Sequence, residues 1–237
     1  MAWSYVGAGT ESSVASGNMT PGLPAGIQAN DILVMLTAQQ ANADTTAEFS
    51  VSANWTKIYV VTSAGVGGGT LRQTVWWHRY DGSTNPGTTV TAGSAGTTHN
   101  AARIIAIRGA PTSGDPVNAY DLFWDTDAAN ADTVADGVRT TNATGTTFHF
   151  FTYTSGGGAS TIGVSGAGNP TFTKQFQTNF DTTTTALALF TGEKSDGAGP
   201  TNFRIITSAM DLGCGGHVAL GPPAAGAAVA SYLGFWG

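Results

Sequence analysis

Polar and apolar residues alternate most strictly along residues 71–80. The two alternating sets are Leu71, Val75 and Trp77 on one face and Trp76, His78 and Tyr80 on the other. A period of two that is rich in aromatic and β-branched residues is typical of a β-strand between two covered surfaces. The turn dipeptide Asp81-Gly82 follows, and residues 101–107 form an aliphatic strand. We therefore expect these two strands to form a hairpin-like unit around which the chain is organised.

Similar short patterns recur along the rest of the chain. Residues 31–38 are a continuous apolar run, which predicts a strand covered on both sides. Residues 146–154 alternate, and Phe148, Phe150, Thr152 and Thr154 share one face. Further strands are expected at residues 2–6, 51–64, 161–164, 171–176, 182–191, 202–209, 217–220 and 227–236, whereas residues 11–26 and 39–50 are expected to be loops, the latter with a helical turn as the alternative.

These patterns define a fold class. Many short strands separated by turn residues, with no long amphipathic helix, predict an all-β fold that is an antiparallel, jelly-roll-like β-sandwich. We expect one domain over residues 1–237. A subdivision near residues 111–140 is the alternative, since turn residues and the chain's acidic segment meet there.

Composition adds the character of the surface. Only 10% of the residues are charged, glycine stands at 33, and threonine is commoner still. Such a surface must consist of hydroxyls, amides and backbone, which suits β-structure and close packing against copies of the same chain. An ordinary secreted β-protein would have a similar composition.

Charge and targeting signals narrow the partners. A net charge of −6, with nine scattered basic residues, argues against a nucleic-acid partner. No apolar run reaches transmembrane length and no signal peptide is visible, so we expect no membrane partner and synthesis in a cytoplasm. The single cysteine, Cys214, excludes an intramolecular disulfide and is expected to be a buried, inert thiol.

No enzymatic signature stands out, and we expect no catalytic residue, cofactor or metal site. A Gly-x-Ser-x-Gly nucleophile elbow is absent. The chain has four histidines: His78, His99, His149 and His217. Their spacing is not that of metal ligands, so we expect strand residues whose ring nitrogens are hydrogen-bonded within the protein. A glycosidase would need two carboxylates, and the three glutamates, Glu11, Glu48 and Glu193, all lie in loop-like sequence.

One acidic segment allows a cation-binding interpretation. Aspartates recur between residues 121 and 136, but the glycine and glutamate that an EF-hand loop needs are not in place. We therefore expect a solvated loop here.

Aromatic residues are the candidate contact residues. Trp76, His78 and Tyr80 could stack on a sugar, but packing in the core or against a neighbouring subunit is the favoured interpretation. The aromatic residues near the two ends are expected to be tucked into a neighbour or into the core, and they are Trp3, Tyr5, Phe235 and Trp236.

A series of short phrases in the first half resembles a known family. The phrases fall at residues 21–26, 30–34, 54–58, 77–82 and 101–109. Their order resembles a β-sandwich module of tailed-bacteriophage virion proteins. Asn30 and Asn54 stand where related sequences have glycine, and Tyr80 stands where they have alanine. The resemblance covers about residues 1–110, and its motifs are turn and core signatures.

The resemblance implies a mechanical role in a virion. The chain would be a capsid decoration (cement or spike) protein or a tail-associated module, often a trimer, binding its own copies and the major capsid protein or tail proteins. Two alternatives remain: a carbohydrate- or receptor-binding module of a tail fibre that contacts a host-surface glycan, and a sandwich glycosidase or lyase.

Overall fold

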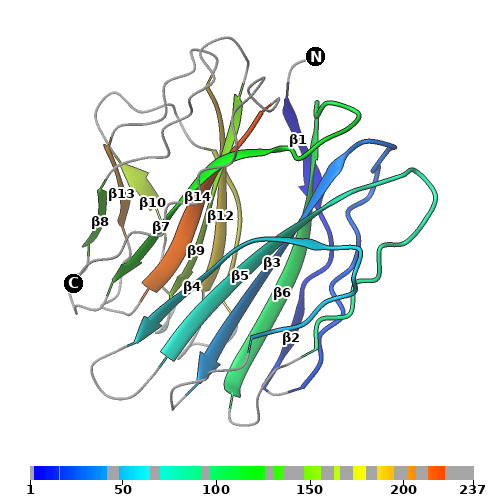
Figure 1. The fold of residues 1–237 in the computed structure, drawn as a ribbon. Coiled ribbons are helices and arrows are strands. Elements are labelled where there is room, and N and C mark those ends of the chain that lie inside the picture. The colour runs from blue at the N-terminus through cyan, green and yellow to red at the C-terminus, as the bar shows by residue number, and fades with distance from the viewer. Residues whose placement is uncertain are drawn as a thin grey trace.

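Strands form all the regular secondary structure in the described part of the chain. The computed structural model describes residues 3–15, 17–41, 48–64, 70–91, 97–125, 131–135, 147–155, 163–165, 173–179, 186–194, 202–206 and 213–221. Within these ranges there is no helix, and all strand pairs are antiparallel (Figure 1). The all-β, antiparallel prediction is confirmed, whereas the jelly-roll-like sandwich stays a prediction.

The first sheet contains the N-terminal strands in the order β1-β6-β3-β5-β4, and β2 also pairs with β6. Their bounds are β1 Ser4–Ala8, β2 Ser12–Val14, β3 Ile32–Ala41, β4 Thr56–Ala64, β5 Thr70–Arg79 and β6 Thr97–Arg108. The expected hairpin of β5 with β6 is wrong, because β3 lies between them and pairs with both. The most apolar strand thus takes the central position, where both faces are covered.

Two further sheets contain the later strands. The second sheet has the order β11-β12-β9-β14-β7, and the third has the order β10-β13-β8. Their bounds are β7 Val117–Asp125, β8 Ala131–Ala135, β9 Thr147–Ser155, β10 Gly163–Ser165, β11 Thr173–Asn179, β12 Ala186–Lys194, β13 Asn202–Ile206 and β14 Gly213–Leu220. In Figure 1 the first sheet runs diagonally across the lower right of the view, and the other two sheets lie to its upper left.

Some loop predictions are wrong. The expected acidic loop contains β7 and β8 over part of its length, and Glu193 lies in β12. The N-terminal loop contains the short strand β2, and β3 extends to Ala41. Strand pairing overrides the low strand propensity of aspartate at Asp121 and Asp125, whose backbones pair with β14.

An inner core joins the first sheet to the second. Alternate residues of β3, beginning with Ile32 and Val34, contribute to it, together with Phe148 and Phe150 of β9 and Val218 of β14. Trp3 belongs to this core, where its ring lies 6.4 Å from the ring of Phe148. Residues on both sides of the 111–140 stretch therefore share one hydrophobic core.

An outer core covers the opposite face of the first sheet. Leu33, Met35 and Trp76 supply the sheet side, and residues from the connecting segments, including Met19 and Trp55, cover them. The prediction that residues 31–38 are covered on both sides is confirmed, because every residue from Asp31 to Ala38 is buried. The predicted separation of alternate β5 residues into two faces is confirmed too.

A buried polar contact crosses the inner core. The Tyr59 hydroxyl of β4 donates to Gln73 Oε1 at 2.9 Å and hydrogen-bonds the Thr152 hydroxyl of β9. Thr152 Oγ1 is also within hydrogen-bonding distance of Gln73 Oε1, at 2.5 Å. Gly216 of β14 faces the Tyr59 ring and leaves it room. One tyrosine therefore connects the two sheets through hydrogen bonds inside an apolar layer.

This contact should make stability depend on alkaline pH. Burial raises the pKa of the Tyr59 phenol above its ordinary value of 10.0, and its hydrogen bond with Thr152 offsets this only in part. A phenol with a raised folded-state pKa stabilises the fold fully below pH 10, and this contribution is lost as the pH rises toward that pKa. We expect Tyr59→Phe to cost about 0.5–1.5 kcal/mol at pH 7 and to flatten the fall of Tm above pH 10. The measurement is thermal unfolding from pH 7 to 11, with Tyr80→Phe as control, and equal pH profiles for Tyr59→Phe and wild type would contradict the prediction.

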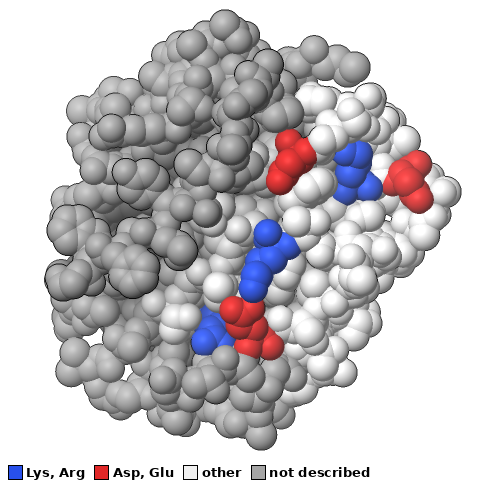
Figure 2. Space-filling model, viewed as in Figure 1, with Lys and Arg blue, Asp and Glu red and all other residues white. Residues whose placement is uncertain are grey.

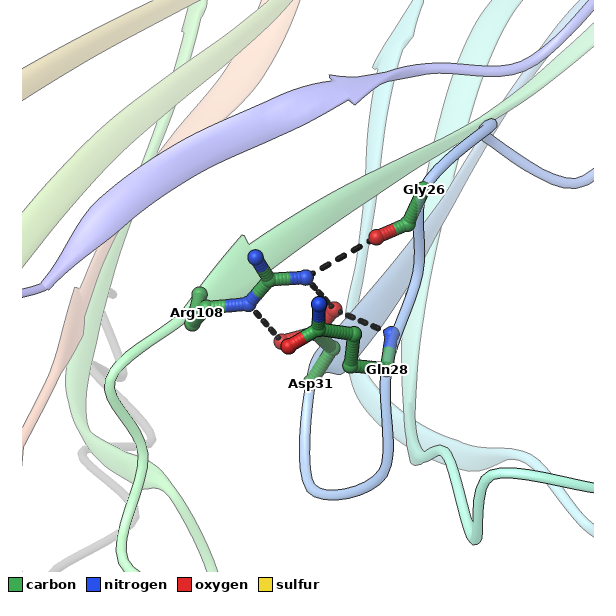
Figure 3. Close-up of polar contacts among 4 residues, drawn as sticks. All are labelled: Gly26, Gln28, Asp31 and Arg108. Carbon is green, nitrogen blue, oxygen red and sulfur yellow. Dashed lines mark hydrogen bonds and ion pairs between the residues drawn. The ribbon is translucent and has the colours of Figure 1, made fainter.

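A second polar contact joins the start of β3 to the end of β6 at one end of the first sheet. Asp31, which precedes β3, accepts hydrogen bonds from Arg108 Nε and Nη2, at the end of β6, both at 2.8 Å (Figure 3). Asp31 Oδ2 also accepts a hydrogen bond from the Gln28 backbone N–H at 2.8 Å, and Arg108 Nη2 donates to the Gly26 carbonyl at 2.9 Å. Asn30 has a φ of 74°, a left-handed conformation that asparagine tolerates better than most residues. Two phrases of the sequence resemblance, around Asn30-Asp31 and Arg108-Gly109, thus meet in space as a structural contact.

Removing the buried carboxylate should weaken this end of the sheet. Asp31 is 1% exposed, so Asp31→Ala removes the side-chain acceptor of the Gln28 backbone N–H and the carboxylate partner of Arg108, which keeps the Gly26 carbonyl as an acceptor. We expect a Tm decrease several times larger than that of Glu48→Ala, which breaks the solvent-exposed pair with Lys57. Differential scanning calorimetry of both variants measures this difference, and equal Tm values would contradict it.

Candidate functional site

A small cleft opens where the edge strand β4 of the first sheet meets the edge strand β7 of the second. It has a volume of about 180 Å³ and is lined by Lys57, Ile58, Trp77, Asp115, Val117 and Tyr120. The lining combines two aromatic rings, one cation and one carboxylate.

A β-bulge in β4 shapes one wall. Lys57 pairs with Trp76 and Tyr59 pairs with Val75, so Ile58 is an extra residue between them. A bulge bends its strand and re-aims neighbouring side chains. Here Ile58 is 8% exposed and joins the inner core, while Lys57 lies at the surface, where its Nζ is 2.7 Å from Glu48 Oε2.

An arginine fixes the loop that forms the other wall. Arg79, at the end of β5, donates to the carbonyl of Pro111 and, at 2.8 Å, to the carbonyl of Gly114. Burial lowers the pKa of Arg79, and the charge of nearby Asp115 acts in the opposite direction. Asp115 Oδ1 in turn accepts a hydrogen bond from the Val117 amide at 2.8 Å. The carboxylate is therefore held at the start of β7.

The aromatic rings are held from behind. The Tyr120 ring lies 5.9 Å from the ring of Tyr59, and the two planes are inclined by 31°. Trp77 packs against the inner core and is half-buried, as is Tyr120. Both rings are therefore packed against the core and remain partly accessible to solvent.

The aromatic residues chosen from the sequence do not form one site. Trp3 and Trp76 are 2% and 4% exposed and belong to different cores, so their positions match core packing and neither ring offers a surface to a partner. Tyr5, His78 and Tyr80 are half-buried. Phe235 and Trp236 lie outside the described residues.

Local contacts account for His78 and Tyr5. His78 Nδ1 is 2.9 Å from the carbonyl oxygen of Asn54, and the His78 ring lies 5.6 Å from that of Trp55. Burial raises the pKa of the Tyr5 phenol, and the charge of Arg103 acts against this shift. His78 is therefore held beside Asn54 and Trp55, and Tyr5 packs against the inner core.

Sequence reasoning missed most of the cleft. It assigned Trp77 to a covered face and did not single out Lys57, Asp115 or Tyr120. These residues come from three segments that are far apart along the chain, so no spacing connects them. The sequence features that could have pointed to the cleft are Lys57 within an apolar strand pattern and the turn residues 111–116 before an aromatic strand.

Groups typical of catalysis are dispersed in the described part of the chain. Glu11 approaches Arg103 at 4.0 Å, Glu48 pairs with Lys57, and Glu193 lies in β12. In the described ranges no three His, Cys, Asp or Glu residues are grouped to hold a metal ion. The four histidines lie in strands, as predicted, and Cys214 is fully buried beside the Val61 carbonyl, as expected.

The basic side chains that the structure describes are used inside the chain. Arg103 donates to the Gly9 carbonyl at 3.1 Å and lies over the ring of Phe176, and Arg72 donates to Thr62 Oγ1. Lys57, Arg79 and Arg108 make the contacts given above. Figure 2 shows few charged groups on this face, scattered over an otherwise uncharged described surface.

Comparison with family models, with curated proteins and with solved structures finds no match for this chain. Within the described ranges, the structure has no helix with the length and apolar character needed to span a bilayer.

Proposed function

We propose that this chain is a structural protein of a tailed-bacteriophage virion, and more specifically a capsid decoration protein. In this role it binds the capsid surface and its own copies as a homotrimer. It turns over no substrate, and its contacts are many and individually weak. A symmetric assembly multiplies such contacts without requiring a strong individual one.

The observation that supports this role most is the internal use of charge. Each lysine and arginine whose side chain is described contacts a carbonyl, hydroxyl or carboxylate of the same chain. The remaining surface is rich in uncharged groups, and only 10% of the whole chain is charged. Burying such a surface against a neighbour removes few charges from water, and the cores of interfaces are generally depleted in charge.

The location and copy number of the protein in purified virions test the proposal. Immunogold labelling locates the chain, and quantitative mass spectrometry counts it against the major capsid protein. We expect labelling of the head, with on the order of a few hundred copies per particle, as icosahedral symmetry implies. A tail position with about three to eighteen copies would support the tail-module alternative, and absence from virions would overturn the structural role.

The oligomeric state gives an independent test. Size-exclusion chromatography of the full chain with light scattering should show a trimer. A monomer that persists at micromolar and higher concentrations would contradict the self-association on which this role depends.

A further inference from the structure

The cleft between β4 and β7 has no role in the proposed capsid function, yet its chemistry is specific. Its volume of about 180 Å³ is below the roughly 300–1,000 Å³ of typical sites for drug-sized ligands. A ligand of this size is a single small ring or one terminal unit of a longer molecule. The cleft is also open to solvent at the surface positions Lys57 and Asp115, so the rest of a longer molecule can extend outward.

The charges in the cleft select against ionic ligands. An anion attracted by Lys57 would meet the carboxylates of Asp115 and of Glu48, which already pairs with Lys57. A cation attracted by Asp115 would meet the charges of Lys57 and of Arg79, which acts on Asp115. Both side chains can nevertheless hydrogen-bond hydroxyl groups. An ammonium group carries three donors, and a carboxylate carries about four acceptor positions. The opposite charges of Lys57 and Asp115 therefore favour a neutral ligand with several hydroxyl groups.

The aromatic rings select for a ligand with an apolar face. Trp77 and Tyr120 are half-buried and held against the inner core, and Tyr59 lies directly behind Tyr120. The negative face of an aromatic ring attracts the weakly positive C–H groups of a saturated ring. Because both rings are already fixed, little side-chain freedom is lost when a ligand binds.

We propose that this cleft binds one neutral pyranose unit of a glycan. Trp77 and Tyr120 contact its C–H face, and Lys57 and Asp115 hydrogen-bond its hydroxyls. The inference develops the carbohydrate-binding alternative into a defined site. This inference does not depend on whether the protein lies on the capsid, because a decoration protein and a fibre module could each carry such a site.

Saturation-transfer NMR with a panel of methyl pyranosides tests the proposal on the full chain. The panel contains the methyl glycosides of glucose, galactose, mannose and N-acetylglucosamine, with glucuronic acid and glucosamine as charged comparisons. We expect at least one neutral glycoside to bind with a Kd of about 1–10 mM, the weak range for a ligand of this size. Stronger binding of a charged sugar than of every neutral one, or no binding of any neutral glycoside at 50 mM (roughly fivefold the weakest expected Kd), would overturn the proposal.

Matched variants locate the site. Tyr120→Leu removes a ring, and Lys57→Met removes the donor while keeping an aliphatic side chain of similar length. Each should weaken binding at least tenfold. Tyr80→Leu changes a half-buried tyrosine that packs on the outer core, away from the cleft lining, and should leave the affinity unchanged.

The variants also separate binding from folding. Lys57 is exposed and its pair with Glu48 is solvent-exposed, so Lys57→Met should lower Tm no more than Glu48→Ala does, and its loss of binding cannot then reflect unfolding. Unchanged binding by both Lys57→Met and Tyr120→Leu would overturn the assignment to this cleft. Virion labelling reports on the capsid role separately, so failure of either proposal is distinguishable from failure of the other.

Discussion

Trp76→Ala is expected to destabilise the protein by about 3–5 kcal/mol, the usual cost of truncating a large buried aromatic residue. Trp76 is 4% exposed and lies in the outer core beside Met35 of β3. Alanine would leave a cavity under the connecting segments that cover this face. Because proteins are stable by only about 5–15 kcal/mol, the variant would lose a large share of its stability.

Urea unfolding followed by tryptophan fluorescence and circular dichroism measures this effect. His78→Ala is the matched control, because His78 lies on the same face of β5 but is half-buried, and its midpoint should fall far less. The same measurement shows whether a change in glycan binding by Trp76→Ala comes from unfolding. A loss of glycan binding in Trp76→Ala would report loss of folding, whereas an unchanged urea midpoint would show that the ring does not support the core.

Gly216→Ala is expected to destabilise the protein by about 1–3 kcal/mol, the typical effect of overpacking a core. A Cβ atom at this position would lie 2.5 Å from Tyr59 Cζ, 2.6 Å from its hydroxyl oxygen and 2.7 Å from Cε1. The ring cannot move away cheaply, since its hydroxyl is bonded to Gln73 and Thr152. The added methyl group must therefore separate the two sheets or break these hydrogen bonds.

Two comparisons make this prediction specific. Gly7→Ala places a Cβ in β1 with no atom within 4 Å, so its unfolding midpoint should stay close to that of wild type. Combining Gly216→Ala with Tyr59→Leu removes the clash, and the double variant should be more stable than the sum of the single effects implies. Strict additivity would show that Tyr59 is not the residue that excludes a side chain at position 216.

The sequence predicted well those features that depend on neighbouring residues. Successive side chains of a strand point to opposite faces, so alternation at residues 71–80 revealed a strand and its two faces, and alternation at residues 146–154 revealed a strand and its buried face. The run at residues 31–38 likewise revealed a strand covered on both sides. The position of β3 between β5 and β6 was missed, because pairing order depends on contacts between segments far apart in sequence.

The candidate site was predicted poorly for the same reason. Trp76, which the sequence singled out as a candidate contact residue, is buried in the outer core, whereas its neighbour Trp77, which the sequence assigned to a covered face, lines the cleft. The two residues differ because connecting segments cover the face of β5 that carries Trp76, whereas the bulge at Ile58 and the loop held by Arg79 form a cleft beside Trp77. None of these features leaves a periodic signal.

The amino-acid sequence by itself determined that this protein is built from strands, which residues of the main strands share a face, and that its surface is poor in charge. These properties follow from backbone geometry and composition, which act locally. Only the tertiary structure decided the order of the strands, the pairing of Asp31 with Arg108, the insertion of Tyr59 beside Gly216, and the meeting of Lys57, Trp77, Asp115 and Tyr120. Each of these joins distant segments, and packing and hydrogen bonding select such contacts only when the whole chain has folded.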